Sequence, residues 1–214
     1  MFWARLLYIA AVAAPADVPP EGPYFEWLKQ KVPYYQSVTG RFAPIYEPFA
    51  RQMVEDYHLD SGIAIDVGGS VGAFAMELAK KTRMIVYNLD IDPWALRLCA
   101  FLVDRAGLTR RVIPIEGDAC NMPFKDNFAD FIFSRGSIPF WPDQAAGLRE
   151  CYRVLKPGGV AYVGGGFGRL LAPEIRAELV RWRLQQWEKG KPEGWKDFGE
   201  QLPELARQAG IPEG

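Results

Sequence analysis

The sequence predicts an α/β fold: a doubly wound, mainly parallel sheet with helices on both faces. Short apolar runs that suit buried strands alternate with amphipathic helical segments through the middle of the chain. The first run, in "IDVGGSVGAFAMELAKK", passes into a helix through a glycine-rich turn that comes after an acidic residue. Such alternation implies parallel strands joined by right-handed crossovers, with ligands bound beyond the carboxyl ends of the strands.

The elements succeed one another in a regular order from Ile63 onward. Asp92 suits a helix N-cap and Pro93 suits the first helical position, so a helix is expected to begin there and to run to about Arg105. The predicted strands are Ile63–Val67, Met84–Leu89, Val112–Ile115, Asn127–Ser134 and Val160–Val163. The other predicted helices are Ala73–Lys81, Pro142–Leu155 and Pro173–Trp187.

Residues 1–58 are expected to form an apolar segment and a helical lid, and residues 59–214 the ligand-binding domain. The lid would consist of helices at residues 24–35 and 42–57, separated by "SVTG". Residues 1–16 have the outline of a secretory signal, a membrane anchor or a short helix that docks on a core. Because their apolar run is too short for a confident membrane span, all three interpretations stay open, and membrane contact with them.

The composition is that of an ordinary globular protein, with 49% hydrophobic and 24% charged residues among 214. A formal net charge of -1 gives no general attraction to polyanions, so no nucleic acid partner is expected. The three cysteines are scattered and His58 is the single histidine, so no metal site is expected. Scattered cysteines fit a reducing compartment, and we predict a cytoplasmic protein.

The glycine turn from Asp66 to Gly72 excludes the common phosphate-binding motifs. A dinucleotide fingerprint that began at Gly68 would need glycine where Ser70 and Ala73 stand. No Gly-Lys-Ser/Thr comes after it, so a Walker loop is absent as well. Asp66 could simply cap the turn, or it could face a ligand that carries no phosphate.

The order of the motifs resembles class I S-adenosylmethionine-dependent methyltransferases of the small-molecule type (methyltransferase domain 11 or 25), which share a Rossmann-like fold. Asp66-x-Gly68-x-Ser70-x-Gly72 is similar to the family's DxGxGxG motif, with Ser70 in place of the middle glycine. The segments "YNLDIDPWAL", "GDACNMPFKDNFADFIFS" and "YRVLKPGGVAYV" are in the order of the later motifs, and "TGRFAPIYEPFARQM" resembles the lid. The resemblance covers about residues 39–168.

The resemblance implies S-adenosyl-L-methionine as the cofactor. Asp90 would bind the ribose hydroxyls, Asp118 would accept from the adenine amino group, and the glycine turn would face the amino acid end. The full cofactor-binding set that we predict is Asp66, Gly68, Gly69, Ser70, Gly72, Asp90, Ile91, Asp118, Ala119 and Ser134.

The acceptor is expected to meet the loop "SRGSIPFW", where the family places substrate-facing residues. Arg135, Ser137 and Trp141 are the candidates there, with Tyr46 from the lid. Arg135 could hold a substrate carboxylate or oxyanion, or it could be a structural ion-pair partner. No general base is identified. The fourth strand lacks an Asn-Pro-Pro-Tyr signature, which favours a small-molecule acceptor over nucleic acid or protein amides.

The chain departs from the family after "LPELARQAGIPEG", where an antiparallel hairpin would normally complete the sheet. We therefore predict a five-stranded parallel sheet with the fifth strand near an edge. A homo-oligomer or the N-terminal segment could cover that edge, or the sheet could be truncated with weakened activity. Two functions stay open: small-molecule methyl transfer, or a non-catalytic S-adenosylmethionine-binding or scaffold protein. The arginines of "IRAELVRWRLQQWEKGK" are interpreted as a solvated helix face.

Overall fold

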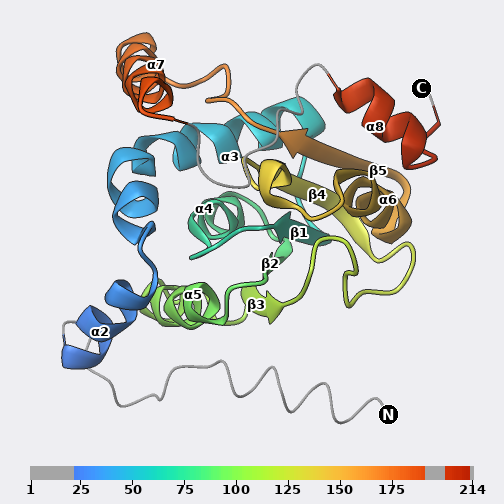
Figure 1. Ribbon diagram of the computed structural model, residues 1–214. Coiled ribbons are helices and arrows are strands. Elements are labelled where there is room, and N and C mark those ends of the chain that lie inside the picture. Colours follow the sequence, from blue (N-terminus) through green and yellow to red (C-terminus); the bar gives the residue numbers. More distant parts are fainter. Residues whose placement is uncertain (1–21, 191–200, 213–214) are drawn as a thin grey trace.

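The computed structural model describes residues 22–190 and 201–212, and a five-stranded parallel sheet of order β3-β2-β1-β4-β5 forms their centre (Figure 1). The strands are β1 (Ile63–Val67), β2 (Ile85–Asp90), β3 (Val112–Glu116), β4 (Ala129–Arg135) and β5 (Leu155–Gly164). Because β1 pairs with β2 on one side and β4 on the other, the order of the strands reverses beside β1. The predicted fold class is confirmed, with β5 at an edge.

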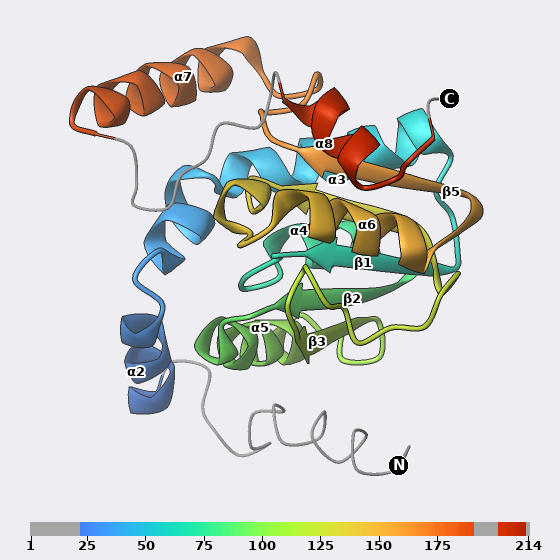
Figure 2. The ribbon, with the colours of Figure 1, turned by 45° about the vertical axis from the view of Figure 1, so that its right-hand side comes forward.

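Helices cover both faces of this sheet (Figures 1 and 2). One face packs against α3 (Ala43–Tyr57), α4 (Ala73–Lys81) and α5 (Pro93–Arg105), and the other against α6 (Gln144–Val154) and α8 (Leu202–Gln208). Successive side chains of β1 alternate between the two cores: Ala64 lies in the first, and Ile65 and Val67 lie in the second. Burial on both sides explains why the sequence of this strand is apolar apart from Asp66.

Two helix starts are set directly by the sequence. The carboxylate of Asp92 accepts a hydrogen bond from the backbone N–H of Trp94 at 2.9 Å, as expected of an N-cap. Asp143 caps α6 in the same way, accepting from the N–H of Ala146 at 2.9 Å. The predicted helix and strand after it need one correction, because α6 ends at Val154 and β5 begins at Leu155. The "KPGG" turn therefore belongs to the strand, whose register on β4 shifts between Ala129 and Phe131.

The break in the lid lies earlier than predicted. The lid consists of α2 (Pro23–Lys31), the π-helix η1 (Ser37–Arg41) and α3, so the first helix ends at Lys31 instead of Tyr35 and the break predicted at "SVTG" is wrong. The hydroxyl of Thr39 donates to the carbonyl of Tyr35 at 2.9 Å, and Val38 packs against the cluster that joins α2 to α5. These contacts make the segment helical despite its β-branched residues and glycine. A π-helix is rare and is frequent at functional sites.

Helix α7 (Pro173–Glu188) lies over the start of α3 and extends away from the sheet (Figure 2). Its one fully buried side chain is Leu179, and Trp182 meets Phe42 edge-on with ring centroids 5.5 Å apart. Thus α7 and the start of α3 together roof the switch point of the sheet.

Three expectations are limited by the extent of the described chain. Residues 1–16, with their predicted signal, anchor or membrane contact, lie outside it. Within residues 22–190 and 201–212, no helix combines the length and apolarity that a membrane span needs. The same residues contain no group of three or more His, Cys, Asp and Glu side chains arranged to hold a metal ion.

Candidate functional site

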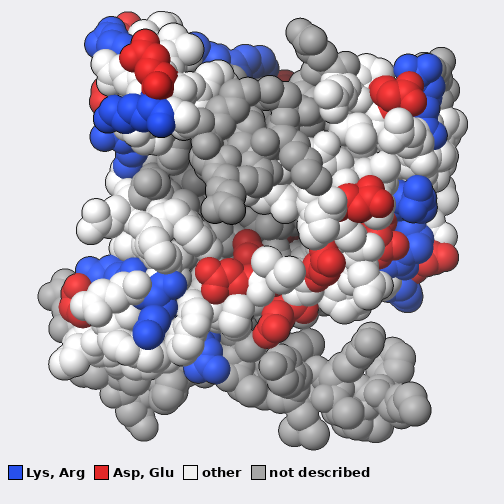
Figure 3. Space-filling model, in the orientation of Figure 1, with Lys and Arg blue, Asp and Glu red and all other residues white. Residues whose placement is uncertain are grey.

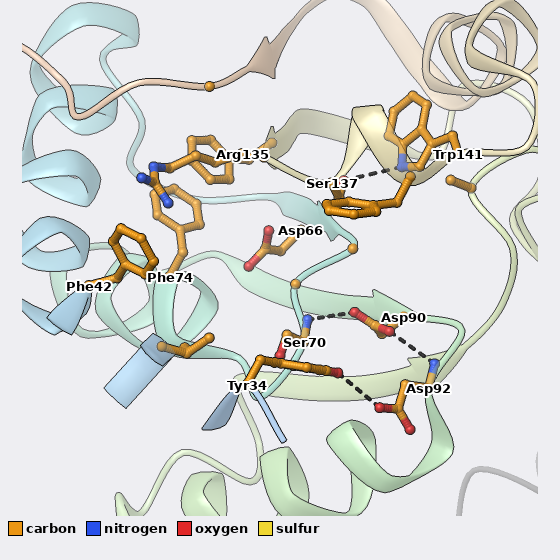
Figure 4. A pocket seen from close by; sticks show the side chains of 18 of the residues that line it. Tyr34, Phe42, Asp66, Ser70, Phe74, Asp90, Asp92, Arg135, Ser137 and Trp141 are labelled. Carbon is orange, nitrogen blue, oxygen red and sulfur yellow. Dashed lines mark hydrogen bonds between the residues drawn. The ribbon is translucent and has the colours of Figure 1, made fainter. Parts of the chain in front are cut away.

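A cavity of about 990 Å³ opens at the carboxyl ends of β1, β2 and β4, beneath the lid and α7 (Figure 4). One half, which we call the acidic half, is lined by Asp66, Asp90, Asp92 and Asp118. The other, the aromatic half, is lined by Phe42, Tyr46, Phe74, Phe133, Trp182 and Trp187, together with Arg135 and Arg183. On the outer surface, acidic side chains gather near the middle of the face in Figure 3, while α7 carries both signs of charge.

The glycine turn is held by the strand beside it. The N–H groups of Gly68 and Gly69 both donate to the carbonyl of Leu89, at 2.8 and 3.1 Å. Gly68 has φ +71°, and a Cβ there would collide with the side chain of Ser137. A glycine is therefore required at this point both by the conformation and by the close approach of the loop after β4.

Ser70 adopts a conformation that favours glycine. Its φ is +53°, in the left-handed region, which explains why the resembling motif has a glycine at this position. The strain is held in place by two contacts. The N–H of Ser70 donates to Asp90 Oδ2 at 2.7 Å, and its carbonyl accepts from Asn88 Nδ2 at 2.8 Å.

Gly72 serves packing between helices. It has φ +78°, and a Cβ would stand 2.5 Å from Cys99 Sγ on α5. Gly72 is not among the residues that line the cavity, whereas Gly68, Gly69 and Ser70 are. Its predicted contact with the cofactor stays a prediction, and the need for glycine here has a steric explanation.

Asp90 is the link between the turn and α5. Its Oδ2 accepts from Ser70 N–H, and its Oδ1 accepts from the N–H of Asp92 at 2.9 Å. Burial raises the pKa of Asp90, while the two backbone hydrogen bonds act in the opposite direction. Each carboxylate oxygen keeps a second lone pair, so the group can still accept from a diol in the cavity.

Asp66, at the end of β1, is the most perturbed acid of the cavity. It is 3% exposed, and burial followed by the nearby charge of Asp90 raises its pKa to about 8. Its Oδ2 has no hydrogen-bond partner in the described chain, and neither has the hydroxyl of Ser70. Buried acceptors without partners are costly, so this wall of the cavity suits a ligand that brings N–H or O–H donors.

The acidic half as a whole fits a cation with several donors. Among the described residues that line it, the charged groups are carboxylates, which would repel a phosphate. Asp118 accepts from the N–H of Cys120 at 2.8 Å, which shapes the turn that brings Ala119 to the cavity. Ile91, 68% exposed, lies at its rim. An ammonium, a sulfonium and a ribose diol are the groups that such a wall accepts.

Ser134, Ser137 and Trp141 form one hydrogen-bonded relay. The Ser137 hydroxyl donates to the carbonyl of Val67 at 2.9 Å, so Ser134 supplies the proton of the 2.6 Å contact between the two hydroxyls. Trp141 Nε1–H also donates to Ser137 Oγ, at 3.2 Å. Ser134 is fully buried and does not line the cavity, whereas Ser137 and Trp141 do. The predicted ligand contacts of these residues are untested; the relay gives them a structural role.

Trp141 and Arg135, both predicted to face the acceptor, lie at opposite ends of the view in Figure 4. Trp141 is 5% exposed and belongs to the core on the α6 side of the sheet, near the acidic half. Arg135 lies with Tyr46 in the aromatic half. Burial raises the pKa of the Tyr46 phenol, and the charge of Arg135 partly counters this. Only these two of the four candidates share the aromatic half.

Sequence reasoning left two contributions to the cavity unassigned. Tyr34, considered only as core or lid, donates its hydroxyl to Asp92 Oδ2 at 2.9 Å and so ties the lid to the acidic half. Arg183 and Trp182 line the aromatic half from α7, so the interpretation of the arginines of that helix as a solvated face is wrong for Arg183. Their neighbour Arg181 is exposed, as predicted. The amphipathic pattern of α7 is weak, so the sequence did not show which face of the helix points inward. Its aromatic residues were the available signal for that face.

Comparisons with known proteins agree with this geometry. The family model described as "Methyltransferase domain" matches residues 65–163. A crystal structure from Methanococcus maripaludis, of a protein assigned to the S-adenosyl-L-methionine-dependent methyltransferases, superposes with a TM-score of 0.74 at 30% identity and covers 94% of this chain and 89% of that one. The chain belongs to the class I S-adenosylmethionine-dependent methyltransferase family.

Two curated relatives of this methyltransferase family member carry names of enzymes. The 2-methyl-6-phytyl-1,4-hydroquinone methyltransferase 1 of Oryza sativa is 30% identical over 174 residues, which are 76% of this chain and 51% of the relative. The sterol 24-C-methyltransferase erg6 of Aspergillus fumigatus is 32% identical over 127 residues, 56% of this chain and 34% of the relative. The chain thus spans about half or less of the length of these relatives.

Proposed function

We propose that this chain catalyses S-adenosylmethionine-dependent methyl transfer to a small apolar ring compound. The observation that carries the proposal is the division of one cavity into an acidic half with unpaired acceptor atoms and an aromatic half beside it. The acidic half suits the cofactor, and the aromatic half suits an acceptor that is mostly apolar. The two named relatives act on a hydroquinone and on a sterol, both ring compounds, which supports this class of acceptor.

Carboxylates and hydroxyls of this chain would hold the cofactor. Asp90 would accept from the ribose hydroxyls, Asp118 from the adenine amino group, and Asp66 Oδ2 and Ser70 Oγ from the ammonium of the amino acid end. When bound, S-adenosylmethionine would supply a methyl group on a cationic sulfur. An acceptor lone pair or π pair would take this methyl group while the S–CH₃ electron pair stayed on sulfur, and any displaced proton would go to solvent. The protein contributes position, orientation and exclusion of water.

The lid would supply that exclusion. Tyr34 closes over the acidic half through its hydrogen bond to Asp92, and Phe42 with Trp182 closes the aromatic half. The described part of the lid, residues 22–58, would thus act as a cover for the methyltransferase domain, predicted at residues 59–214. The predictions of cytoplasmic localisation and of a homo-oligomer through the β5 edge stay predictions.

The first test is calorimetric titration with S-adenosylhomocysteine, the demethylated form of the cofactor. We expect micromolar or tighter binding by the wild-type protein, followed by radiolabelled methyl transfer to at least one member of a panel of hydroquinones, phenols and sterols. Absence of binding would contradict the proposal. Binding without transfer to any of these, or to thiols and amines, would favour the non-catalytic alternative.

A further inference from the structure

Two arginine side chains face the aromatic half without a carboxylate to balance them. Within the described residues, no carboxylate oxygen lies within 4 Å of the guanidinium of Arg135 or Arg183. Burial lowers the pKa of Arg135, the phenol of Tyr46 acts in the opposite direction, and the positive charge of Arg183 lowers it further. Paired like charges in a cavity usually indicate a ligand of opposite sign.

The surroundings of Arg135 are aromatic rather than acidic. Its Nε–H donates to the carbonyl of Gly166 at 2.8 Å, and no other hydrogen bond joins it to the described chain. The rings of Phe42, Phe49 and Phe167 each lie 5.9 Å from its guanidinium carbon. The ring faces help to hold the cation in place, and the two terminal nitrogens remain available as a planar pair of donors.

Arg183 approaches the same ring from the roof of the cavity. Its guanidinium carbon lies 4.9 Å from the ring of Phe167, so this ring contacts both arginines. Burial lowers the pKa of Arg183 too. Desolvation of two cations is costly in free energy, and a structural role would not require both.

We propose that the acceptor is an organic anion with an apolar body, whose carboxylate or phenolate oxygen pairs with Arg135 in the aromatic half and is additionally attracted by Arg183. This inference rests on the proposed function and narrows it: a neutral sterol-like acceptor would leave both cations unpaired. The rings supply contact for the apolar body, and the terminal nitrogens of Arg135 match the two oxygens of a carboxylate or the single oxygen of a phenolate.

Two pairs of probes test the proposal by calorimetry, each differing mainly in charge. The carboxylate arm compares 2-naphthoate with 2-naphthalenemethanol, and the phenolate arm compares ionised 4-nitrophenol with 4-nitroanisole. Titrations are run on the free protein and on protein saturated with S-adenosylhomocysteine. We expect the anion to bind about tenfold tighter, or more, in at least one arm, because one charge-assisted pair is lost in the neutral probe. Whichever arm succeeds identifies the source of the oxyanion.

The variants separate charge from shape. Arg135→Gln should reduce the preference for the anion to less than about twofold, and Arg135→Lys should restore part of it. Arg183→Gln should give a smaller loss. Arg181→Gln on the exposed side of α7 is the matched control and should change nothing. No preference in either arm of the wild type, absence of binding by every probe, or an unchanged preference in Arg135→Gln would overturn the proposal.

Two further measurements distinguish failure of this proposal from loss of stability and from loss of the cofactor site. Thermal unfolding of ligand-free Arg135→Gln should show an equal or higher Tm, because an unbalanced buried charge is removed. A marked fall in Tm together with an unchanged preference for the anionic probe would assign Arg135 a structural role and overturn the proposal. Titration of every variant with S-adenosylhomocysteine reports on the cofactor site alone. Its failure in the wild type would contradict the proposed function, while the probe preference is still measured on free protein.

Discussion

In the half of the cavity beside β1 and β2, four carboxyl groups meet without a basic side chain among the described lining residues, whereas the half beneath α3 and α7 holds two guanidinium groups without a carboxylate. Within one cavity, each set of charges could have neutralised the other by direct ion pairs. The phenol of Tyr46 is near both sets, because its pKa is raised by burial, lowered by the charge of Arg135 and raised by the charge of Asp66. This separation indicates that the two halves suit ligand groups of opposite charge.

The largest loss of ligand affinity in the acidic half is expected from Asp90→Asn. The change removes the charge from an acceptor of two ribose hydroxyls and weakens the bond to Ser70 N–H, so S-adenosylhomocysteine affinity should fall about 100-fold or more. Calorimetry measures the loss. Asp104→Asn, on the exposed side of α5, is the control and should bind as the wild type does. Equal affinity for both variants would remove Asp90 from the site.

The protonation state of Asp66 gives a second test of the charge in the acidic half. With a folded-state pKa of about 8 against an ordinary value of 3.8, Asp66 stabilises the ligand-free fold below pH 4 and this contribution is lost as the pH rises to about 8. A cationic ligand should lower that pKa again, so binding at pH 7 should release close to one proton. Titrations in buffers of different ionisation enthalpy measure the release.

Asp66→Asn is the control for this linkage. Its binding should release no proton from this site, and its unfolding free energy should vary less between pH 4 and pH 8 than that of the wild type. Proton release that persists in Asp66→Asn would assign the titration to another group, with Asp90 the first candidate because burial raises its pKa as well.

In the aromatic half, Trp182→Ala should weaken the acceptor more than the cofactor. The substitution removes the ring that meets Phe42 at 5.5 Å and that Arg41 covers at 4.8 Å, which opens the roof of this half. We expect KM for the acceptor to rise about tenfold with S-adenosylhomocysteine affinity nearly unchanged. Tyr152→Ala, an exposed aromatic position on α6, is the matched control. Parallel loss of both affinities would mean that the two halves are not independent.

The smallest effect is expected from Ser70→Gly. Glycine relieves the strain of φ +53° and removes a buried hydroxyl without a partner, while the more flexible unfolded chain offsets part of the gain. The free energy of unfolding should therefore change by about 1 kcal/mol or less. Denaturant titration measures it. If S-adenosylhomocysteine affinity falls more than about threefold in the same variant, the Ser70 hydroxyl contacts the ligand.

Local sequence patterns determined most of the frame and the acidic half. An apolar run forms a strand whichever segment comes after it, so β1 to β4 lie within a residue or two of their predicted bounds. Asp92 and Pro93 start a helix because capping is a local hydrogen bond. Asp66, Asp90 and Asp118 come after or at the ends of strands, and in a parallel sheet the carboxyl ends of neighbouring strands meet at one edge, so their convergence could be predicted from spacing alone.

Only the tertiary structure decided the aromatic half. Its walls come from the lid, α4, the end of β4 and α7, which are joined by no local periodicity. Packing across the roof decides which face of α7 turns inward. Other tertiary contacts made "SVTG" helical, through the cluster that joins α2 to α5, and placed Ser137 and Trp141 in a relay beneath the glycine turn. A residue's chemistry is fixed by its type, but whether Arg183 meets water or a ligand depends on how α7 packs, and its neighbour Trp182 is held by Phe42 from the distant lid.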